Sequence, residues 1–354
     1  MQMKTRIIKA DPARFRAERL AGAARTIREG GLCVFPTETV YGIGGDATSP
    51  DSAKKIYAAK GRPSDNPLII HVAFPEEAER YAVTVPLYYK LAKHFMPGPL
   101  TVIMRKRDTI PLEVTGGLDT VAVRCPSHPV AHELIRLAGV PVAAPSANIS
   151  GRPSATSARY AAEDFSGKVE YIIDGGPCEV GLESTIVKIT GDDSLLLLRP
   201  GAVTYEALLC VCSEVSVSEA AAGAVLRDGE RPECPGMKYR HYAPSKPLTL
   251  VKGSDAARTA FFRARLGEGQ TVVICSSELA SSMPEGSEVI DIGPSKDLAT
   301  QSRRIFAALR MSDELPGNRI FAEMPETEGI GLALYNRLIR AAAHTVADAD
   351  AEMK

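Results

Sequence analysis

Two cations, Lys60 and Arg62, lie two residues apart at the start of a short loop that contains two prolines. A Ser-Pro pair opens the alanine- and lysine-rich run before them, and proline is favoured at the first position of a helix. Gly61 follows this run, where a left-handed residue commonly ends a helix. The spacing therefore predicts a helix over 50–60 whose C-terminal end presents both cations to a phosphate or a carboxylate. A solvated basic turn is the alternative for the Lys-x-Arg pair by itself.

Five polar clusters between residues 1 and 205 each adjoin an apolar, strand-like run. In an α/β sheet, such strand-end loops converge on one crevice. Taken singly, each cluster is also explained by a turn or a helix cap. Together they supply cations and hydroxyls that suit a ligand carrying phosphates and a small polar group. The clusters are residues 36–42, 60–71, 116–124, 143–154 and 182–185, the last with Arg199 close behind.

Several familiar catalytic motifs are missing from the sequence. It contains no phosphate-binding P-loop, no dinucleotide glycine pattern, no serine elbow, no H-E-x-x-H and no kinase motif set. His128 and His132 are four residues apart, with Glu133 nearby, but no third ligand converges on them. The sequence therefore predicts no metal site built from protein side chains, and a helix start explains the histidine pair.

The length and composition of the chain argue against a membrane-spanning protein and against a strongly basic nucleic-acid-binding protein. The chain has 354 residues, a length that favours two domains, and a formal net charge of −1, which gives no global basic footprint for nucleic acid. It contains no run of about 20 apolar residues that could span a membrane. The N-terminus lacks the apolar core of a signal peptide. Seven scattered cysteines fit free thiols in a reducing cytoplasm, where we expect the protein to reside.

The order of the expected elements favours α/β architecture in two domains. Alternating short β-rich and helical runs over residues 1–207, with many Pro-bounded loops, predict a twisted mixed sheet. Residues 208–246 have the composition of a linker, although the aromatic and basic run at 235–244 is unusual for a free one. A second alternation over 247–345 predicts a smaller Rossmann-like domain. Residues 346–354 are expected to form a tail.

Six separated motifs of the chain resemble, in order, those of the family that contains YrdC and Sua5, the threonylcarbamoyl-AMP synthases of tRNA modification. Residues 235–244 and the C-terminal α/β domain resemble the longer, Sua5-type branch. The resemblance covers nearly the whole chain and implies a YrdC-like catalytic domain. The matching elements are Pro36–Gly42, Lys60-x-Arg62-Pro63 with Asn66-Pro67-Leu68, Pro97–Thr101, Thr120–Arg124, Pro145–Asn148 and Glu183–Thr185.

The resemblance implies a reaction in which L-threonine, bicarbonate or CO2, and ATP give L-threonylcarbamoyladenylate and pyrophosphate. A separate transferase complex would use this product to form N6-threonylcarbamoyladenosine at position 37 of tRNAs that read ANN codons. Such a transfer needs in-line positioning and neutralisation of charge by cations and Mg²⁺, which accompanies ATP. A protein nucleophile is not needed.

The resemblance also implies roles for individual residues. Lys60 and Arg62 would act catalytically by holding the triphosphate, and Arg124 would pair with the threonine carboxylate. Tyr239 would cover the nucleotide as part of a lid. The implied ATP-binding residues are Lys60, Arg62, Asn66, Thr120, Ser146, Ser154, Arg199 and Tyr239. The implied threonine-binding residues are Thr39, His71, Arg124, Ser184 and, through its backbone, Ala144.

Two other functions stay open on the sequence alone. A double-stranded RNA or nucleotide-binding module without synthase activity would use a basic concave surface, although the near-zero net charge argues against RNA binding as the main function. Carbamoyl transfer, as in hydrogenase-maturation factors, would come with C-x2-C zinc motifs that this chain lacks. The C-terminal domain would either brace the lid or contact the transferase partner. The basic residues of the first alternative are Lys54, Lys55, Lys60, Arg62, Arg105, Lys106 and Arg107.

Overall fold

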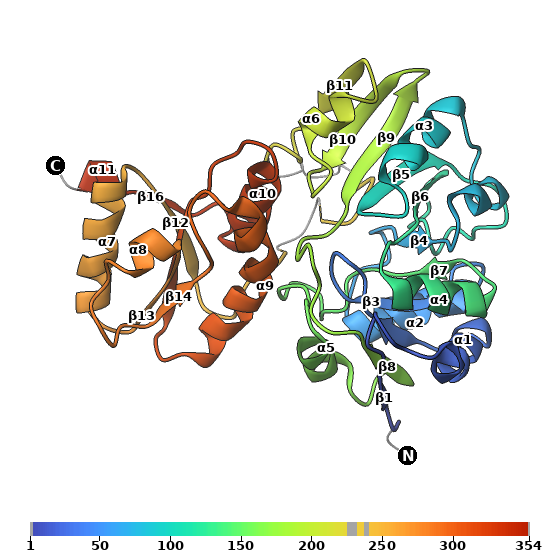
Figure 1. The fold of residues 1–354 in the computed structure, drawn as a ribbon, viewed down its shortest axis with the longest axis horizontal. Helices are drawn as coiled ribbons and strands as arrows, with labels where there is room; N and C mark the ends of the chain where they lie inside the picture. The colour runs from blue at the N-terminus through green and yellow to red at the C-terminus, as the bar shows by residue number, and fades with distance from the viewer. Residues whose placement is uncertain (1–2, 225–231, 237–240, 353–354) are drawn as a thin grey trace. The chain divides into compact units, whose positions relative to one another are not determined.

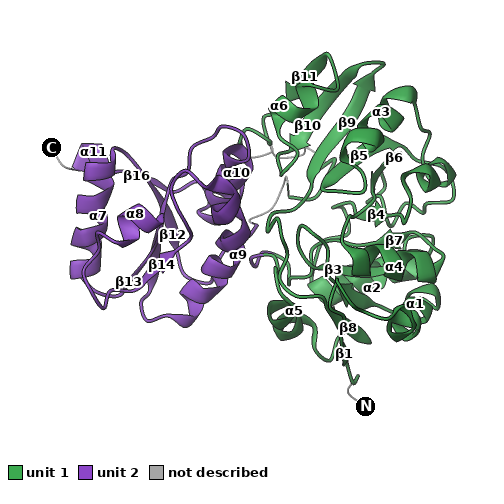
Figure 2. Ribbon diagram, in the orientation of Figure 1, with its two compact units in different colours: residues 1–150, 154–238 green, residues 151–153, 239–354 purple. Residues whose placement is uncertain are grey.

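The computed structural model describes residues 3–224, 232–236 and 241–352, which form two compact units (Figure 1). Unit 1 comprises residues 1–150 and 154–238, and unit 2 comprises residues 151–153 and 239–354 (Figure 2). Both units alternate strands with helices, so the predicted α/β class with two domains matches the architecture.

Unit 1 is built on an 11-stranded mixed sheet. Parallel and antiparallel neighbours alternate irregularly across it, as expected from the Pro-bounded loops of the sequence. In order across the sheet, the strands are β1 (Arg6–Lys9), β8 (Tyr171–Asp174), β2 (Cys33–Phe35), β3 (Gly42–Asp46), β7 (Val142–Ala143), β4 (Ile69–His71), β6 (Thr120–Arg124), β5 (Leu100–Arg105), β9 (Thr185–Gly191), β10 (Ser194–Arg199) and β11 (Glu214–Val217).

The register at the centre of this sheet determines where the candidate residues lie. Strand β4 runs parallel to β6, with His71 opposite Arg124, and β5 runs antiparallel to β6, with Thr101 opposite Arg124. His71 and Arg124 therefore end their strands at the same edge. Asn66 precedes β4 and Thr120 is the first residue of β6. These two residues therefore lie together at the starts of the two strands, away from the ends that carry His71 and Arg124.

The helices of unit 1 pack their apolar sides against the sheet. Helix α2 begins at Pro50, where the Ser49 hydroxyl accepts a hydrogen bond from the Ser52 amide at 3.2 Å, and it ends at Gly61, whose φ is 60°. Both ends of this predicted helix are thereby confirmed. The helices are η1 (Ala17–Leu20), α1 (Ala21–Arg28), α2 (Pro50–Lys60), η2 (Pro75–Arg80), α3 (Pro86–Phe95), α4 (Pro129–Ala138), α5 (Ala158–Phe165) and α6 (Tyr205–Leu209).

Unit 2 is a smaller layered α/β domain with a five-stranded sheet. Its strand pairs are parallel, and α7 and α11 cover one face while α9 and α10 cover the other (Figure 1). In order, the strands are β14 (Val289–Asp291), β13 (Thr271–Cys275), β15 (Arg319–Glu323), β12 (Leu248–Lys252) and β16 (Val346–Asp348). The helices are α7 (Asp255–Gly267), α8 (Ser277–Ala280), α9 (Leu298–Glu314), α10 (Gly331–Ala341) and α11 (Ala349–Glu352).

Two strands lie outside the predicted domain cores. Strand β11, in the segment expected to be linker, pairs in parallel with β10. Strand β16, in the expected tail, pairs in parallel with β12. Both are short edge strands, of four and three residues, so their sequences carry little periodic signal. Of the aromatic and basic side chains in the run at 235–244, those of His241 and Tyr242 are described, and Tyr242 is buried against Phe306 within unit 2.

Among the described residues, no helix combines the length and the apolar character that crossing a membrane would require. All seven cysteines are free thiols, and Cys210 is the exposed one.

Candidate functional site

Lys60 is buried at the end of α2, and its side chain is used to hold a loop. Only 2% of the residue is exposed. Its Nζ donates to the main-chain oxygens of Ser146 and Asn148, each at 2.5 Å. Its own carbonyl accepts from the Ser150 amide at 2.9 Å. Lys60 therefore lies beside the predicted nucleotide residue Ser146 and fixes the main chain of the loop after β7.

Arg62 and Asn66 form a second buried group in the loop that leads into β4. Arg62 Nη2 donates to the carbonyl oxygens of Asn66 and Pro67 at 3.1 and 3.0 Å. Asn66 is 1% exposed, and neither its side-chain oxygen nor its side-chain nitrogen has a hydrogen-bond partner among the described residues. Leaving a buried amide without partners is costly, so this group is well placed to bind a polar ligand.

Arg124, at the end of β6, forms a buried ion pair. The residue is 4% exposed, and its Nη2 donates to Glu38 Oε1 at 2.8 Å. The second oxygen of Glu38 accepts from the Ser127 amide at 3.2 Å. Nε of Arg124 has no hydrogen-bond partner among the described residues. The guanidinium therefore retains a donor for an anionic group such as a carboxylate.

His71, opposite Arg124 in the register, is an uncharged imidazole at neutral pH. Burial, with the nearby Arg124 charge, lowers the pKa of His71 from 6.5 to about 3. Its Nδ1 lies 3.3 Å from the Val142 carbonyl oxygen. The site therefore places a neutral polar ring beside a cation, and the ring adds no positive charge of its own.

The lowered pKa of His71 predicts a loss of stability in mild acid. The unfolded chain binds a proton below pH 6.5 that the folded chain binds only near pH 3. The free energy of unfolding should therefore fall as the pH drops below 6.5, by up to about 1.4 kcal/mol per pH unit from this group. Urea unfolding at several pH values from 7 to 5 would measure the slope. His71→Asn should make the slope shallower, with the remainder coming from groups such as His128 and His344, whose pKa values burial also lowers. An unchanged slope in the variant would contradict the assignment.

Ser184 lies at the meeting point of residues predicted for both substrates. Arg199 donates from Nε to the Ser184 carbonyl at 3.1 Å and from Nη2 to its hydroxyl at 3.3 Å. The Ser184 and Thr101 hydroxyls are 2.7 Å apart. Beside them, the Ser154 hydroxyl donates to Glu183 Oε1 at 2.6 Å. The predicted nucleotide residues Arg199 and Ser154 thus adjoin the predicted threonine residue Ser184.

The structure brings Thr39 and Ala144 toward the same region, and it places Thr120 toward the same ends of β4 and β6 as Asn66. The Thr39 carbonyl accepts from the Gly181 amide at 3.1 Å, close to the loop that leads to Ser184. Ala144 is buried, and its amide donates to the Ile69 carbonyl at 2.9 Å. Thr120 begins β6, at the other end of the strand from Arg124. Tyr239, predicted to cover the nucleotide, lies outside the described residues.

Three side chains had no role in the sequence analysis although they lie inside the quoted motifs. Glu38 pairs with Arg124, Thr101 contacts Ser184, and Glu183 contacts Ser154. In the sequence, each of the three is visible only as a polar residue near an apolar strand. This pattern does not reveal which residue each side chain contacts, because the contacted residue is far away along the chain.

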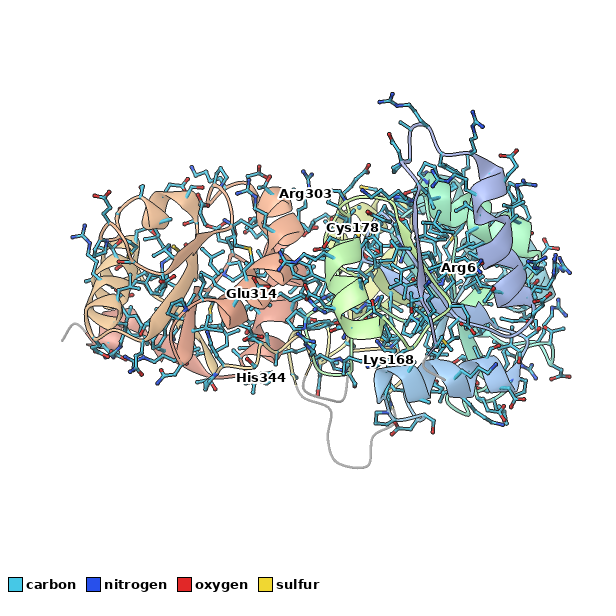
Figure 3. The ribbon with its side chains drawn as sticks, turned by 90° about the horizontal axis from the view of Figure 1, so that it is seen from below. Arg6, Lys168, Cys178, Arg303, Glu314 and His344 are labelled. Carbon is cyan, nitrogen blue, oxygen red and sulfur yellow. The ribbon has the colours of Figure 1, made fainter. Side chains whose placement is uncertain are left out.

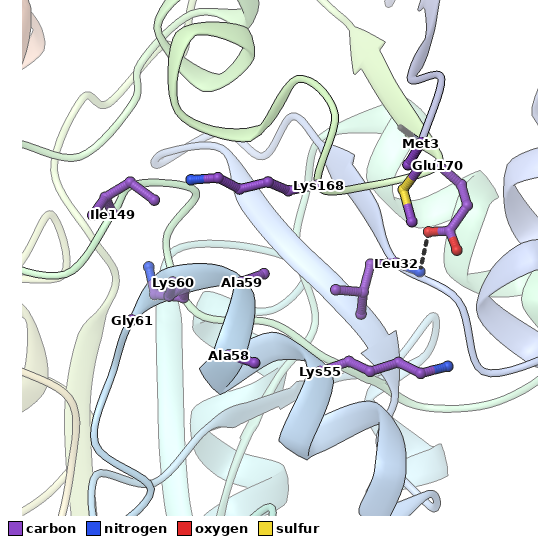
Figure 4. Close-up of a pocket in the computed structure, with 10 residues that line it drawn as sticks. All are labelled: Met3, Leu32, Lys55, Ala58, Ala59, Lys60, Gly61, Ile149, Lys168 and Glu170. Atoms are coloured by element: carbon purple, nitrogen blue, oxygen red, sulfur yellow. Dashed lines mark hydrogen bonds between the residues drawn. The ribbon is translucent and has the colours of Figure 1, made fainter. Parts of the chain in front are cut away.

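A pocket of about 680 Å³ lies on one side of α2 (Figure 4). Its walls include Leu32, Ala58 and Ile149, with Lys168 projecting along one side. Glu170 is held there by a hydrogen bond from the Leu32 amide at 2.9 Å. Lys60 is the one predicted site residue that lines this pocket, so we do not place the substrates in it.

Two buried thiols lie close to the ion pair. Burial, reinforced by the Glu38 charge, raises the pKa of Cys125 to about 12 and also raises the pKa of Cys178, which is labelled in Figure 3. Both thiols stay protonated at neutral pH, and a protonated thiol is a poor nucleophile. The chemistry of this region therefore comes from cations, amides and hydroxyls.

Two family models cover most of the chain. The model named for Sua5, YciO and YrdC, described as "Telomere recombination", matches residues 25–201. A second model, described as "Threonylcarbamoyl-AMP synthase, C-terminal domain", matches residues 203–343. These two ranges include the candidate site and the sheet of unit 2 up to β15.

The chain is similar over most of its length to curated proteins called threonylcarbamoyl-AMP synthase. One from Pyrococcus abyssi is 44% identical over 332 residues, which is 92% of this chain and 94% of the relative. One from Bacillus subtilis is 42% identical over 329 residues, with the same shares covered.

The solved structures agree with these sequence relatives. The crystal structure of P. abyssi Sua5 complexed with L-threonine matches with a TM-score of 0.90 and 42% identity, covering 97% of this chain and 99% of that one. Escherichia coli YciO matches 56% of this chain with a TM-score of 0.50 and 22% identity, a likeness of fold alone.

Proposed function

The chain belongs to the Sua5–YciO–YrdC family, and from that membership we infer that it is a nucleotidyltransferase that makes L-threonylcarbamoyladenylate for the threonylcarbamoyladenosine modification of tRNA. The substrates are L-threonine, bicarbonate or CO2, and ATP. The observation that carries this assignment in the structure is the buried Arg124, whose Nε keeps a donor without a partner among the described residues. A buried cation with an unused donor fits the carboxylate of an amino acid.

In this proposal, the threonine subsite lies at the edge of the sheet where β4 and β6 end. Nε of Arg124 would donate to the substrate carboxylate. The neutral ring of His71 and the hydroxyl of Ser184 would then meet the polar groups of threonine at its other end. A neutral His71 suits this position, because a second cation there would repel the substrate ammonium.

The proposed nucleotide subsite lies between the end of α2 and the loop before β4. The side-chain amide of Asn66 supplies a buried donor and acceptor without partners among the described residues. Arg62 holds the loop that contains Asn66, and Lys60 holds the loop after β7, in both cases through main-chain oxygens. ATP would enter as its Mg²⁺ complex, with the ion carried mainly by phosphate oxygens and water, as Mg²⁺ commonly is.

The reaction then balances without a covalent enzyme intermediate. The threonine amine adds to CO2 and loses a proton, giving a carbamate. A carbamate oxygen attacks the α-phosphorus of ATP, the bond from this phosphorus to the bridging oxygen breaks, and pyrophosphate leaves. The protein contributes alignment and a cationic environment, which are the main needs of phosphoryl-type transfers.

The decisive experiment is a mass spectrum of the product formed from ATP, bicarbonate and L-threonine. We expect threonylcarbamoyladenylate, together with pyrophosphate, and no product when threonine is omitted. Pyrophosphate release that does not depend on threonine would contradict the assignment. Tight binding of double-stranded RNA without any adenylate would favour the binding-module alternative.

We also propose how the product is used. A tRNA threonylcarbamoyl transferase complex would receive the adenylate in the cytoplasm, where tRNAs are modified and read. The linker containing Tyr239 would shield the adenylate from water until then. Weak direct RNA binding would fit such a hand-over.

A further inference from the structure

Glu38 has no assigned role, yet it is the counter-ion of the residue that carries the functional assignment. We propose that Glu38 is a positioning residue, which holds the Arg124 guanidinium so that its Nε faces the threonine carboxylate. This inference rests on the proposed function, because it concerns the threonine subsite of that reaction.

Glu38 is itself fixed at three points. Its Oε1 accepts from Arg124 Nη2 at 2.8 Å, and its Oε2 accepts from the Ser127 amide at 3.2 Å. Its carbonyl oxygen accepts from the Val180 amide at 2.8 Å. The carboxylate therefore joins the loop after β2 to the segment after β6, and both ends of the ion pair are buried, with 5% of each side chain exposed.

This anchoring determines which guanidinium donor faces a ligand. A guanidinium is planar, so a hydrogen bond that holds Nη2 also sets the direction of the Nε–H bond. Without Glu38, the guanidinium could rotate about the side-chain torsions, and the Nε–H bond would no longer point in one fixed direction. Threonine would then have to immobilise the guanidinium during binding, which weakens affinity.

The charge of Glu38 has a second consequence. The pair is neutral as a whole, so the substrate meets an oriented donor without a net positive charge. Replacing the carboxylate by an amide leaves the buried cation uncompensated and turns one of the two acceptors into a donor. Glu38→Gln therefore changes charge and orientation at nearly constant volume.

The test compares Glu38→Gln with Glu133→Gln, measuring KM for threonine, KM for ATP and the melting temperature. Glu133 is a matched control because it also forms an ion pair with an arginine, Arg136, at 2.7 Å, but on the surface of α4. We expect Glu38→Gln to raise KM for threonine by about tenfold, as for the loss of one charge-assisted hydrogen bond. KM for ATP should stay within about twofold, as for a remote substitution. The Glu133 variant should change neither constant.

If Glu38 had a merely structural role, its replacement would not change KM for threonine selectively. Equal rises in both KM values, or an unchanged KM for threonine in a folded variant, would overturn the inference. If Glu38→Gln does not fold, Glu38→Asp keeps the charge on a shorter side chain. This variant should also raise KM for threonine more than KM for ATP, but by a smaller factor. If the wild-type protein makes the adenylate while these variants show no selective rise in KM for threonine, the positioning role fails and the proposed function stands.

Discussion

Arg124→Gln is expected to lower kcat/KM for threonine by about 100- to 1,000-fold, because truncating one partner of a buried, hydrogen-bonded charge pair is strongly unfavourable and leaves the other partner's charge buried and unpaired. The substitution deletes the Nε donor proposed for the substrate carboxylate. It also leaves Glu38 buried without its cation. Steady-state kinetics with threonine varied at saturating ATP would measure the loss.

The stability cost of Arg124→Gln can be separated from its effect on activity. Adding Glu38→Gln to this variant removes the uncompensated carboxylate and should recover part of the lost melting temperature. It should not recover the use of threonine, because the donor is still missing. A double variant with restored kcat/KM would show that Arg124 acts through folding rather than through the substrate.

Lys60→Met is expected to reduce pyrophosphate release by about 100-fold or more, comparable to the removal of one preorganised donor from an active site. The variant keeps an unbranched side chain but loses both hydrogen bonds to the Ser146 and Asn148 carbonyls. The loop after β7 is then held less firmly, and the nucleotide subsite loses a cation. KM for ATP should rise more than the dissociation constant of threonine, which calorimetry can measure without ATP.

Lys55→Met supplies the matched control for this experiment. Lys55 lies on the same helix, α2, and its Nζ also donates to a main-chain oxygen, that of Gly30, at 2.6 Å, but on the exposed surface. We expect near wild-type kinetics from this variant. Undiminished pyrophosphate release in Lys60→Met would rule out the role of Lys60 in the nucleotide subsite.

Helix α2 illustrates what the sequence was sufficient to predict. Its N-cap at Ser49, its proline at the first turn and its left-handed Gly61 all act within a few residues of one another. Because these preferences are local, the helix ends could be read directly. The strand-end clusters were equally visible, since each depends on the residues next to an apolar run.

The edge strands and the linker illustrate what the sequence left out. Strand β11 has one buried residue, Val215, among four, and β16 has none that is fully buried. Their membership of a sheet depends on backbone pairing with β10 and β12 rather than on a hydrophobic pattern. Backbone pairing is possible for almost any residue, so composition could not reveal it.

The sequence by itself determined the α/β class, the ends of α2, and which cations and hydroxyls stand at strand ends, because those features follow from local preferences and from the family motifs. Only the tertiary structure decided the partners. It pairs Arg124 with Glu38 and Lys60 with the Ser146 carbonyl, two contacts that each join residues 86 positions apart. Such contacts depend on the order and register of strands, which arise from many weak non-local interactions and leave no mark in any short stretch of chain.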